Sequence, residues 1–233
     1  MNPGDRKGAQ MTDTVSRAGV MAELRALEDP AMRAANEARG DDHGVNLSRL
    51  RDLAKRLKTQ NALAKDLWAT GDTAARLLAT LISKPSAYTV DELDAMIREI
   101  RAPKLLDWLV TNLVKPGRHK EVLRLRWKDE DDLVGRAGWS LTTEKVIKDP
   151  AGLDLPALLD QIEAEMKTAP EPKQWAMNHC LAEIGIHNPS LRARAIGIGE
   201  KLEVLIDYPA SPGCTPPYAP VWIAEMVRRT EAR

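Results

Sequence analysis

Apolar residues recur every three or four positions along most of this chain, which is the spacing of amphipathic helices. The pattern is most regular over residues 45–82, where it predicts three short helices joined by polar residues. Asn46, Asn61 and Asp72 stand where N-caps are expected, and Gly71 stands where one helix must end before the next begins. Helices this short cannot bury their apolar faces alone, so we expect antiparallel neighbours that stack in layers.

The same spacing predicts helices over most of the remaining chain, and no segment reads convincingly as a β-strand. Thr89 and Glu92 have the spacing of a capping box, Pro103 opens a helix, and Gly185 is placed to end one. We therefore predict an all-α fold. Outside residues 45–82, the predicted helices cover residues 15–28, 31–39, 89–100, 103–114, 119–127, 132–141, 155–166, 175–184, 189–205 and 221–227.

Length and composition predict one large domain. The chain has 233 residues, of which 43% are hydrophobic, so it can bury a sizeable core. Residues 1–14 are polar and Gly-rich, and we expect a disordered extension there. Residues 15–233 are expected to form a single helical domain, and its Pro-rich end, residues 207–233, is expected to form a cap.

Charge is balanced over the whole chain, with 34 Lys and Arg against 34 Asp and Glu. Net charge therefore gives no argument for a nucleic-acid partner. Basic residues do gather within residues 49–58 and 118–128, and acidic residues gather within residues 91–94 and 129–132. Binding to phosphates needs only one positive face, which these clusters could supply; solvated helix faces of mixed sign are the alternative interpretation.

Several classes of site and location lack support in the sequence. Two cysteines far apart, with no Cys-x-x-Cys, favour a reduced cytoplasmic protein, and no apolar run has the length of a membrane span. The motifs of phosphate-binding loops, serine hydrolases and zinc proteases are missing. A metal site built from His179, Cys180, His187 and Cys214 is disfavoured, since adjacent helical residues diverge by about 100°. We expect no metal and no cofactor.

The central helices resemble the DNA alkylation-repair glycosylases of the AlkD type. The resemblance lies in Leu53-Ala54-Lys55, in LAKDLWATG over residues 63–71 and in ARLLA over residues 75–79, and it continues more thinly through residues 127–141 and 177–188. It implies a right-handed superhelix of antiparallel HEAT-like helix pairs that binds duplex DNA carrying alkylated bases in its concave face. The resemblance further implies a monomer that cuts the N-glycosidic bond of cationic alkylated purines. It also implies that these bases are selected by distortion of the duplex instead of by a deep pocket.

The resemblance also implies a catalytic carboxylate, for which Asp107 is the candidate. In one register of the family motif Asp107 takes the catalytic position and Pro103 replaces a Trp one turn earlier; in the other, shifted by three residues, Val110 leaves that position empty. We prefer the first register, because the apolar residues that follow then keep their places. Neither register puts a Trp before the Asp at the family spacing, and Trp108 projects about 100° away from Asp107. A solvated carboxylate on a helix face is the alternative.

The second aromatic position of the family motif is occupied by His179, and Trp175 lies one turn earlier on the same helix face, where it could supply the missing ring. A structural, hydrogen-bonded histidine is the alternative interpretation for His179. A helical scaffold that binds protein or damaged DNA without cleavage is the alternative function. The resemblance, or a position near the matching residues, marks several basic residues for phosphate contact: Arg136, Arg76, Lys55, Lys65, Lys104, Lys115 and Arg118. Each of them could instead form a surface ion pair.

Overall fold

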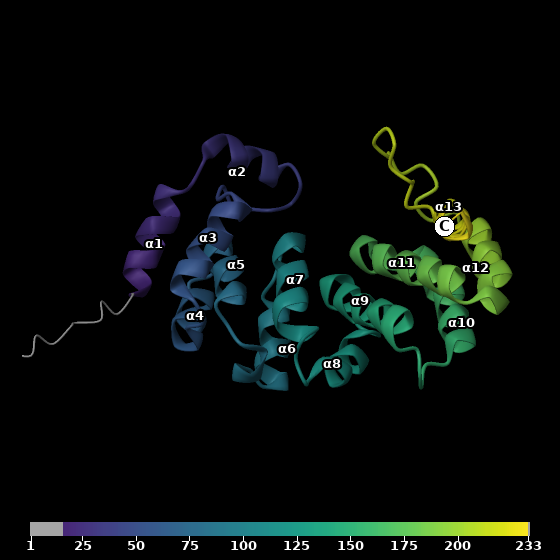
Figure 1. Cartoon of the computed structure of the whole chain (residues 1–233), viewed down its shortest axis with the longest axis horizontal. Coiled ribbons are helices and arrows are strands. Elements are labelled where there is room, and N and C mark those ends of the chain that lie inside the picture. The colour runs from purple at the N-terminus through teal and green to yellow at the C-terminus, as the bar shows by residue number, and fades with distance from the viewer. Residues whose placement is uncertain (1–15, 233) are drawn as a thin grey trace, which may run out of the picture. The chain divides into compact units, whose positions relative to one another are not determined.

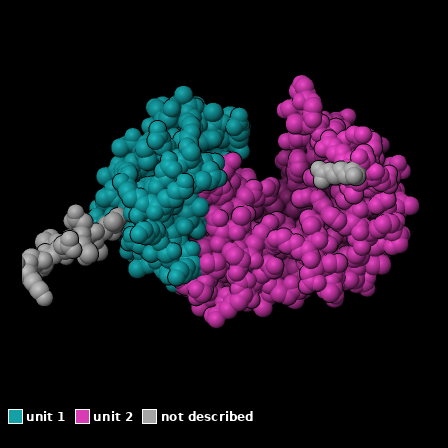
Figure 2. Space-filling view, viewed as in Figure 1, with its two compact units in different colours: residues 1–84 teal, residues 85–233 magenta. Residues whose placement is uncertain are grey.

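The computed structural model of the chain describes residues 16–232, so the disorder predicted for residues 1–14 lies outside the described residues. Two compact units meet in sequence at Lys84 and Pro85, and Figure 2 shows them in different colours. We call them unit 1, which ends at Lys84, and unit 2, which begins at Pro85. The single domain and the C-terminal cap stay predictions.

Helices make up both units (Figure 1). Within residues 16–232 there is no strand, and an isolated antiparallel bridge joins Glu28 and Val45. The predicted all-α class is therefore confirmed. Unit 1 contains α1 (Arg17–Ala26), α2 (Pro30–Glu37), α3 (Leu47–Leu57), α4 (Asn61–Trp68) and α5 (Thr73–Leu81). Unit 2 contains the 3-10 turn Pro85–Ala87, α6 (Val90–Arg98), α7 (Pro103–Leu109), the π-helical turn Val110–Val114, α8 (Lys120–Trp127), α9 (Asp132–Lys148), α10 (Leu155–Glu165), the 3-10 turn Met166–Thr168, α11 (Glu171–His187), α12 (Pro189–Leu202) and α13 (Ala219–Glu231).

The helix starts in unit 1 follow the predicted caps at two of three positions. Asn46 accepts a hydrogen bond from the Ser48 N–H at 2.8 Å, and Asp72 accepts one from the Ala75 N–H at 2.8 Å. The prediction for Asn61 is wrong: Gln60 holds the N-cap position, and Asn61 begins the helix. The Asn61 side chain instead accepts from the Lys84 N–H at 2.9 Å, so it connects the start of α4 to the segment that follows α5.

Unit 1 buries the apolar stripe that the sequence predicts. Helix α5 packs against α3 and α4, and α1 contacts α4 and α5. Leu50, Leu67, Leu77 and Leu78 are completely buried between these helices. The short helices α3, α4 and α5 thus bury their apolar residues against neighbouring helices of the unit, as the patterning requires.

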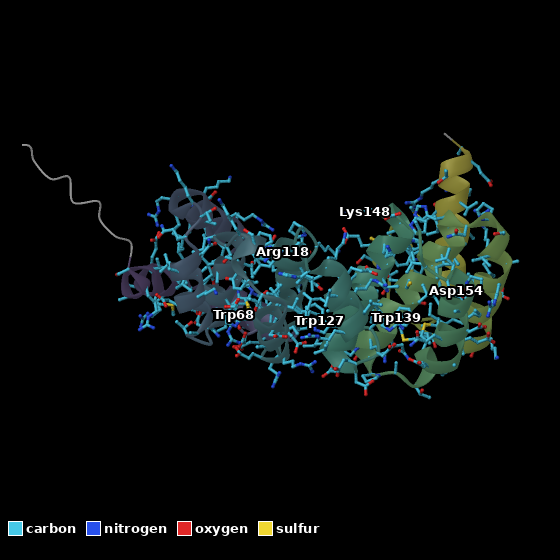
Figure 3. The ribbon with its side chains drawn as sticks, turned by 90° about the horizontal axis from the view of Figure 1, so that it is seen from below. Trp68, Arg118, Trp127, Trp139, Lys148 and Asp154 are labelled. Carbon is cyan, nitrogen blue, oxygen red and sulfur yellow. The ribbon has the colours of Figure 1, made fainter. Side chains whose placement is uncertain are left out.

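Unit 2 is built around α9 and α11, which lie side by side (Figure 1). Helices α7 and α8 pack against α9, whereas α12 and α13 pack against α11. Trp127 and Trp139 are completely buried and lie between the helices of this unit (Figure 3). The capping box of Thr89 and Glu92 is present at the start of α6. Two long adjacent helices give the unit a rigid base from which side chains can converge.

Several helix boundaries in unit 2 differ from the prediction: α9 continues to Lys148, α11 begins at Glu171, α12 ends at Leu202, and α13 covers Ala219–Glu231. Two further differences involve Gly185 and Val110. Gly185 does not end α11, which continues to His187; a Cβ at this glycine would stand 2.6 Å from Ile223 Cδ1, so the glycine allows α13 to pack closely. The helix predicted over residues 103–114 changes at Val110 into a π-helical turn, in which the Lys115 N–H donates to the Val110 carbonyl at 2.8 Å. Turns of this kind are frequent near functional sites.

No helix within residues 16–232 combines the length and the apolar content that crossing a membrane would require.

Candidate functional site

Three helices of unit 2 bring predicted site residues to one pocket. Asp107 comes from α7, Arg136 from α9, and Trp175 and His179 from α11. Together with Ser140 and Ala176 they line a pocket of about 100 Å³. Asp107, Trp175, His179 and Arg136 are far apart in sequence, so their convergence is a property of the helix packing.

The carboxylate in this pocket is paired with an arginine. Arg136 Nη2 donates to Asp107 Oδ1 at 3.0 Å and to Oδ2 at 3.1 Å. The Asp107 side chain is 57% exposed and that of Arg136 is 28% exposed. The pair therefore fixes the direction of the carboxylate while leaving it accessible from solvent, which a ligand-contacting group requires and a core ion pair would not provide.

Aromatic contacts hold the other wall of the pocket. The His179 ring stacks on Trp222, with centroids 5.0 Å apart and planes 13° apart. The Trp175 ring meets Tyr208 edge to face, with centroids 5.1 Å apart. Trp222 belongs to α13, and Tyr208 belongs to the Pro-rich segment before it. The C-terminal segment thus supports both α11 rings that face Asp107.

Glu183 fixes His179 from within the same helix. The carboxylate of Glu183 lies 3.2 Å from His179 Nε2 and 3.1 Å from His187 Nε2, and its side chain is 13% exposed. Burial alone would raise the pKa of Glu183, but the hydrogen bond and positive charge of His179, together with His187, bring the pKa below its ordinary value. This carboxylate therefore orients the imidazole that lines the pocket.

The lowered pKa of Glu183 makes its contribution to stability depend on pH. That contribution is fully present above the unfolded-state value, near 4.5, and is lost as the pH falls through the lower folded-state value. We expect the free energy of unfolding of wild type to exceed that of Glu183→Gln at pH 6, and the difference to shrink at pH 3. Urea unfolding at both pH values measures this difference in the free energy of unfolding, and Glu200→Gln, at an exposed position, is the control. A difference between wild type and Glu183→Gln that is the same at pH 3 and pH 6 would contradict the proposed contribution of Glu183.

Basic residues marked for phosphate contact lie in both units. Lys55 is 81% exposed on the side chain, and it lines a shallow cavity of about 410 Å³ with Arg51 and Lys58 in unit 1. Arg76 is engaged within its own unit: its Nε donates to the Trp68 carbonyl at 3.0 Å, and its guanidinium lies 5.0 Å from the Trp68 ring centre. Lys55 has the accessibility that a phosphate contact needs, whereas Arg76 already holds a neighbouring turn.

The remaining basic candidates differ in exposure. Lys65 and Arg118 are exposed, and Arg118 is labelled in Figure 3; Lys104 and Lys115 are half-buried. Arg118 Nε donates to His119 Nε2 at 3.1 Å. All of these side chains except Lys65 belong to unit 2.

The cysteines do not form part of the pocket that contains Asp107. Cys180 is completely buried, and burial raises the pKa of its thiol to about 12, so the thiol is neutral near pH 7. Cys214 is exposed in the Pro-rich segment. Among residues 16–232, no group of three or more His, Cys, Asp or Glu side chains is arranged to hold a metal ion.

Sequence reasoning missed four residues of this site: Ser140, Glu183, Tyr208 and Trp222. Ser140 and Glu183 each follow a predicted site residue by four positions on the same helix, so the helical repeat was a usable signal for both. Tyr208 lies within the Pro-rich segment and Trp222 follows it, and no local pattern indicates the path of this segment.

Comparisons with known proteins agree with this architecture. The family model described as DNA alkylation repair enzyme matches residues 20–222. A solved structure from a new family of proteins related to the HEAT-like repeat DNA glycosylases, with affinity for branched DNA structures, matches with a TM-score of 0.75. The two chains are 24% identical, and the match covers 93% of this chain and 95% of that chain. No curated protein matches. The likeness to the solved structure confirms the predicted HEAT-like fold.

Proposed function

The chain belongs to the DNA alkylation repair enzyme family, and from this we propose that it binds duplex DNA and releases cationic alkylated purines by hydrolysis. The observation that carries the proposal is the pocket in which Asp107 and Arg136 face Trp175 and His179. The position of Asp107 in this pocket supports the register of the family motif that gives Asp107 the catalytic position. We propose that the protein acts as a cytoplasmic monomer without a metal or a cofactor.

Hydrolysis of such a nucleotide breaks the bond between sugar C1′ and the base nitrogen. The bonding electrons leave with the base and cancel its positive charge, while the sugar develops oxocarbenium character. The Asp107 carboxylate stabilises that charge, and an oxygen of water then bonds to C1′ and releases a proton to solvent. A pocket of about 100 Å³ has room for a few water molecules beside the carboxylate.

The other pocket residues have supporting roles in this proposal. Arg136 positions Asp107 through the paired hydrogen bonds, and its guanidinium is suited to contact a DNA phosphate at the same place. The faces of Trp175 and His179 offer aromatic surface to a cationic base or sugar. Phosphate contacts that position the duplex without reading its sequence are assigned to Lys55, Lys65, Lys104, Lys115 and Arg118, whereas Arg76 is assigned the role of holding the turn at Trp68.

Binding of branched DNA without cleavage is the second candidate function. The solved structural neighbour comes from a family with affinity for branched DNA, and His179 of this chain occupies the position of a family Trp. A scaffold of this kind would keep the basic residues and have no use for an exposed carboxylate. The pairing of Asp107 with Arg136 at a pocket is the feature that favours hydrolysis.

Incubation of the protein with duplex DNA methylated at guanine N7 and adenine N3 tests the proposal. We expect free methylated purines, measured by mass spectrometry, to appear faster than from DNA alone, and we expect the DNA affinity to fall steeply with salt. Tight binding to a three-way junction with no release from any methylated duplex would favour the branched-DNA function. Salt-insensitive binding would argue against both functions.

A further inference from the structure

The hydrogen bond between His179 and Glu183 determines which ring nitrogen of His179 can accept a proton. His179 Nε2 lies 3.2 Å from Glu183 Oε1, and the lowered pKa of Glu183 keeps this carboxylate ionised near pH 7, so it can only accept a hydrogen bond. The hydrogen of the neutral ring therefore lies on Nε2, and Nδ1 carries the lone pair. Nδ1 is hydrogen-bonded to none of residues 16–232.

The ring that carries this lone pair is held at the pocket of Asp107. It stacks on Trp222 with centroids 5.0 Å apart, and rotation of the ring would break both this contact and the hydrogen bond to Glu183. The His179 side chain lines the pocket and is 42% exposed. A proton accepted by the ring can therefore pass on to solvent.

The hydroxyl group of Ser140 lies at the same pocket. Two threonines of the same helix, Thr142 and Thr143, each donate a hydrogen bond at 2.9 Å to the carbonyl four residues earlier. The Ser140 hydroxyl forms no bond of this kind, and it is hydrogen-bonded to none of residues 16–232. It is therefore available to donate a hydrogen bond to a water molecule in the pocket.

Asp107 is poorly suited to accept the proton of that water. Both of its carboxylate oxygens already accept hydrogen bonds from Arg136 Nη2, at 3.0 Å and 3.1 Å. In the proposed hydrolysis the negative charge of Asp107 must persist while the sugar is positive, and a proton would cancel it. Of the described residues that line this pocket, His179 is of the type that exchanges protons near neutral pH.

We propose that Ser140 holds the attacking water in this pocket and that His179 Nδ1 takes its proton. This inference rests on the proposed function and adds a general base to it. As the oxygen of water bonds to C1′, one of its O–H bonds breaks, and the electrons of that bond stay on the oxygen, which becomes a hydroxyl group of the sugar. The proton bonds to Nδ1 and then leaves to solvent, so His179 accepts the proton before solvent does.

The test uses two histidines that share one carboxylate. His187 lies 3.1 Å from the Glu183 carboxylate and is 44% exposed, but it does not line the pocket. We expect His179→Gln to lower the single-turnover release of 7-methylguanine from methylated duplex by about 100-fold, the lower end of general-base effects, and His187→Gln to leave it unchanged. His179→Phe keeps an aromatic ring beside Trp222 but has no lone pair, so it should be as slow as His179→Gln.

Ser140→Ala removes the hydroxyl that holds the water. We expect release to fall by about threefold to tenfold, the effect of losing one neutral hydrogen bond. Affinity for the methylated duplex, measured by fluorescence anisotropy, should stay at the wild-type value, and circular dichroism checks that each variant is folded.

Two further measurements report on the proton transfer itself. A protonated ring cannot accept a proton, and histidines change charge between about pH 5 and 8, so release by wild type should fall from pH 8 to pH 5.5, while release by His179→Gln stays level. Release should also be slower in deuterium oxide than in water for wild type, and equal in both for His179→Gln.

The charged groups that face the His179 ring are the same in wild type and in His179→Gln. They are Asp107 from α7, Arg136 from α9 and Glu183 from α11, whereas α13 contributes the uncharged ring of Trp222. Titration of these groups would therefore affect both proteins, and a pH dependence that is confined to wild type belongs to His179.

The outcomes separate this inference from the function on which it rests. Wild-type rates of release by His179→Gln, or the same pH dependence in both proteins, overturn the general base while the hydrolysis itself stands. Wild-type rates of release by His179→Phe assign the ring to stacking alone and also overturn it. Failure of wild type to release any methylated purine overturns both the inference and the proposed function.

Discussion

Asp107→Asn is expected to lower the single-turnover rate of methylated-purine release by about 100-fold to 1,000-fold, the usual effect of removing one group that stabilises transition-state charge. The amide keeps the shape of the side chain and can still accept a hydrogen bond from Arg136, but it carries no charge to set against the oxocarbenium ion. Affinity for DNA should not weaken, because a carboxylate repels phosphate. The measurement is the rate of base release with protein in excess over methylated duplex.

Asp160→Asn is the matched control for this prediction. Asp160 also pairs with an arginine, Arg194, and its side chain is 71% exposed, but it lies on α10 and does not line the pocket of Asp107. Release by this variant should equal that of wild type. A similar loss in both variants would show that the effect comes from a disturbed ion pair and would remove Asp107 from the chemistry.

Gly138→Ala is expected to lower the free energy of unfolding by about 3 kcal/mol or more, at or beyond the upper end of ordinary overpacking. A Cβ at this position of α9 would stand 2.3 Å from the Lys128 backbone nitrogen and 2.5 Å from its Cα. Backbone atoms cannot rotate away as a side-chain end can, so α9 must separate from the residues that follow α8. Helix α9 also carries Arg136, and the same variant should impair base release.

Gly197→Ala provides the comparison for stability. This glycine is exposed within α12, and a Cβ there would have no heavy atom within 4 Å. Alanine restricts the unfolded chain and favours the helix, so the free energy of unfolding should rise by about 0.5 to 1 kcal/mol. Urea denaturation of both variants measures the effects, and a Gly138→Ala protein as stable as wild type would refute the close approach of α9 and α8.

The fold could be predicted from local signals because short helices have strong ones. The apolar spacing located the helices of unit 1, and the caps at Asn46, Asp72 and Thr89 follow from side chains that bond to their own helix. The predictions at Asn61 and Gly185 were wrong for one reason. Each residue makes a contact with a distant segment, Asn61 with Lys84 and Gly185 with Ile223, and such contacts leave no local pattern.

The candidate site could be predicted in part. Resemblance marked Asp107, Arg136 and His179, the helical repeat added Trp175, and the structure brings all four to one pocket. The resemblance also implied selection without a deep pocket, and it gave no indication of the aromatic walls. Those walls depend on how the Pro-rich segment and α13 return to α11, which only the three-dimensional structure shows.

The most direct test of the central claim uses a mimic of the charged sugar. Two duplexes are compared, one with a cationic 1-azaribose residue and the other with neutral tetrahydrofuran at the same position, and their dissociation constants are measured for wild type and Asp107→Asn. If Asp107 stabilises positive charge on the sugar, wild type binds the cationic mimic about 100-fold more tightly or better, and the variant binds both duplexes equally. Equal binding of both duplexes by folded wild type would contradict the assignment of Asp107 as the catalytic carboxylate.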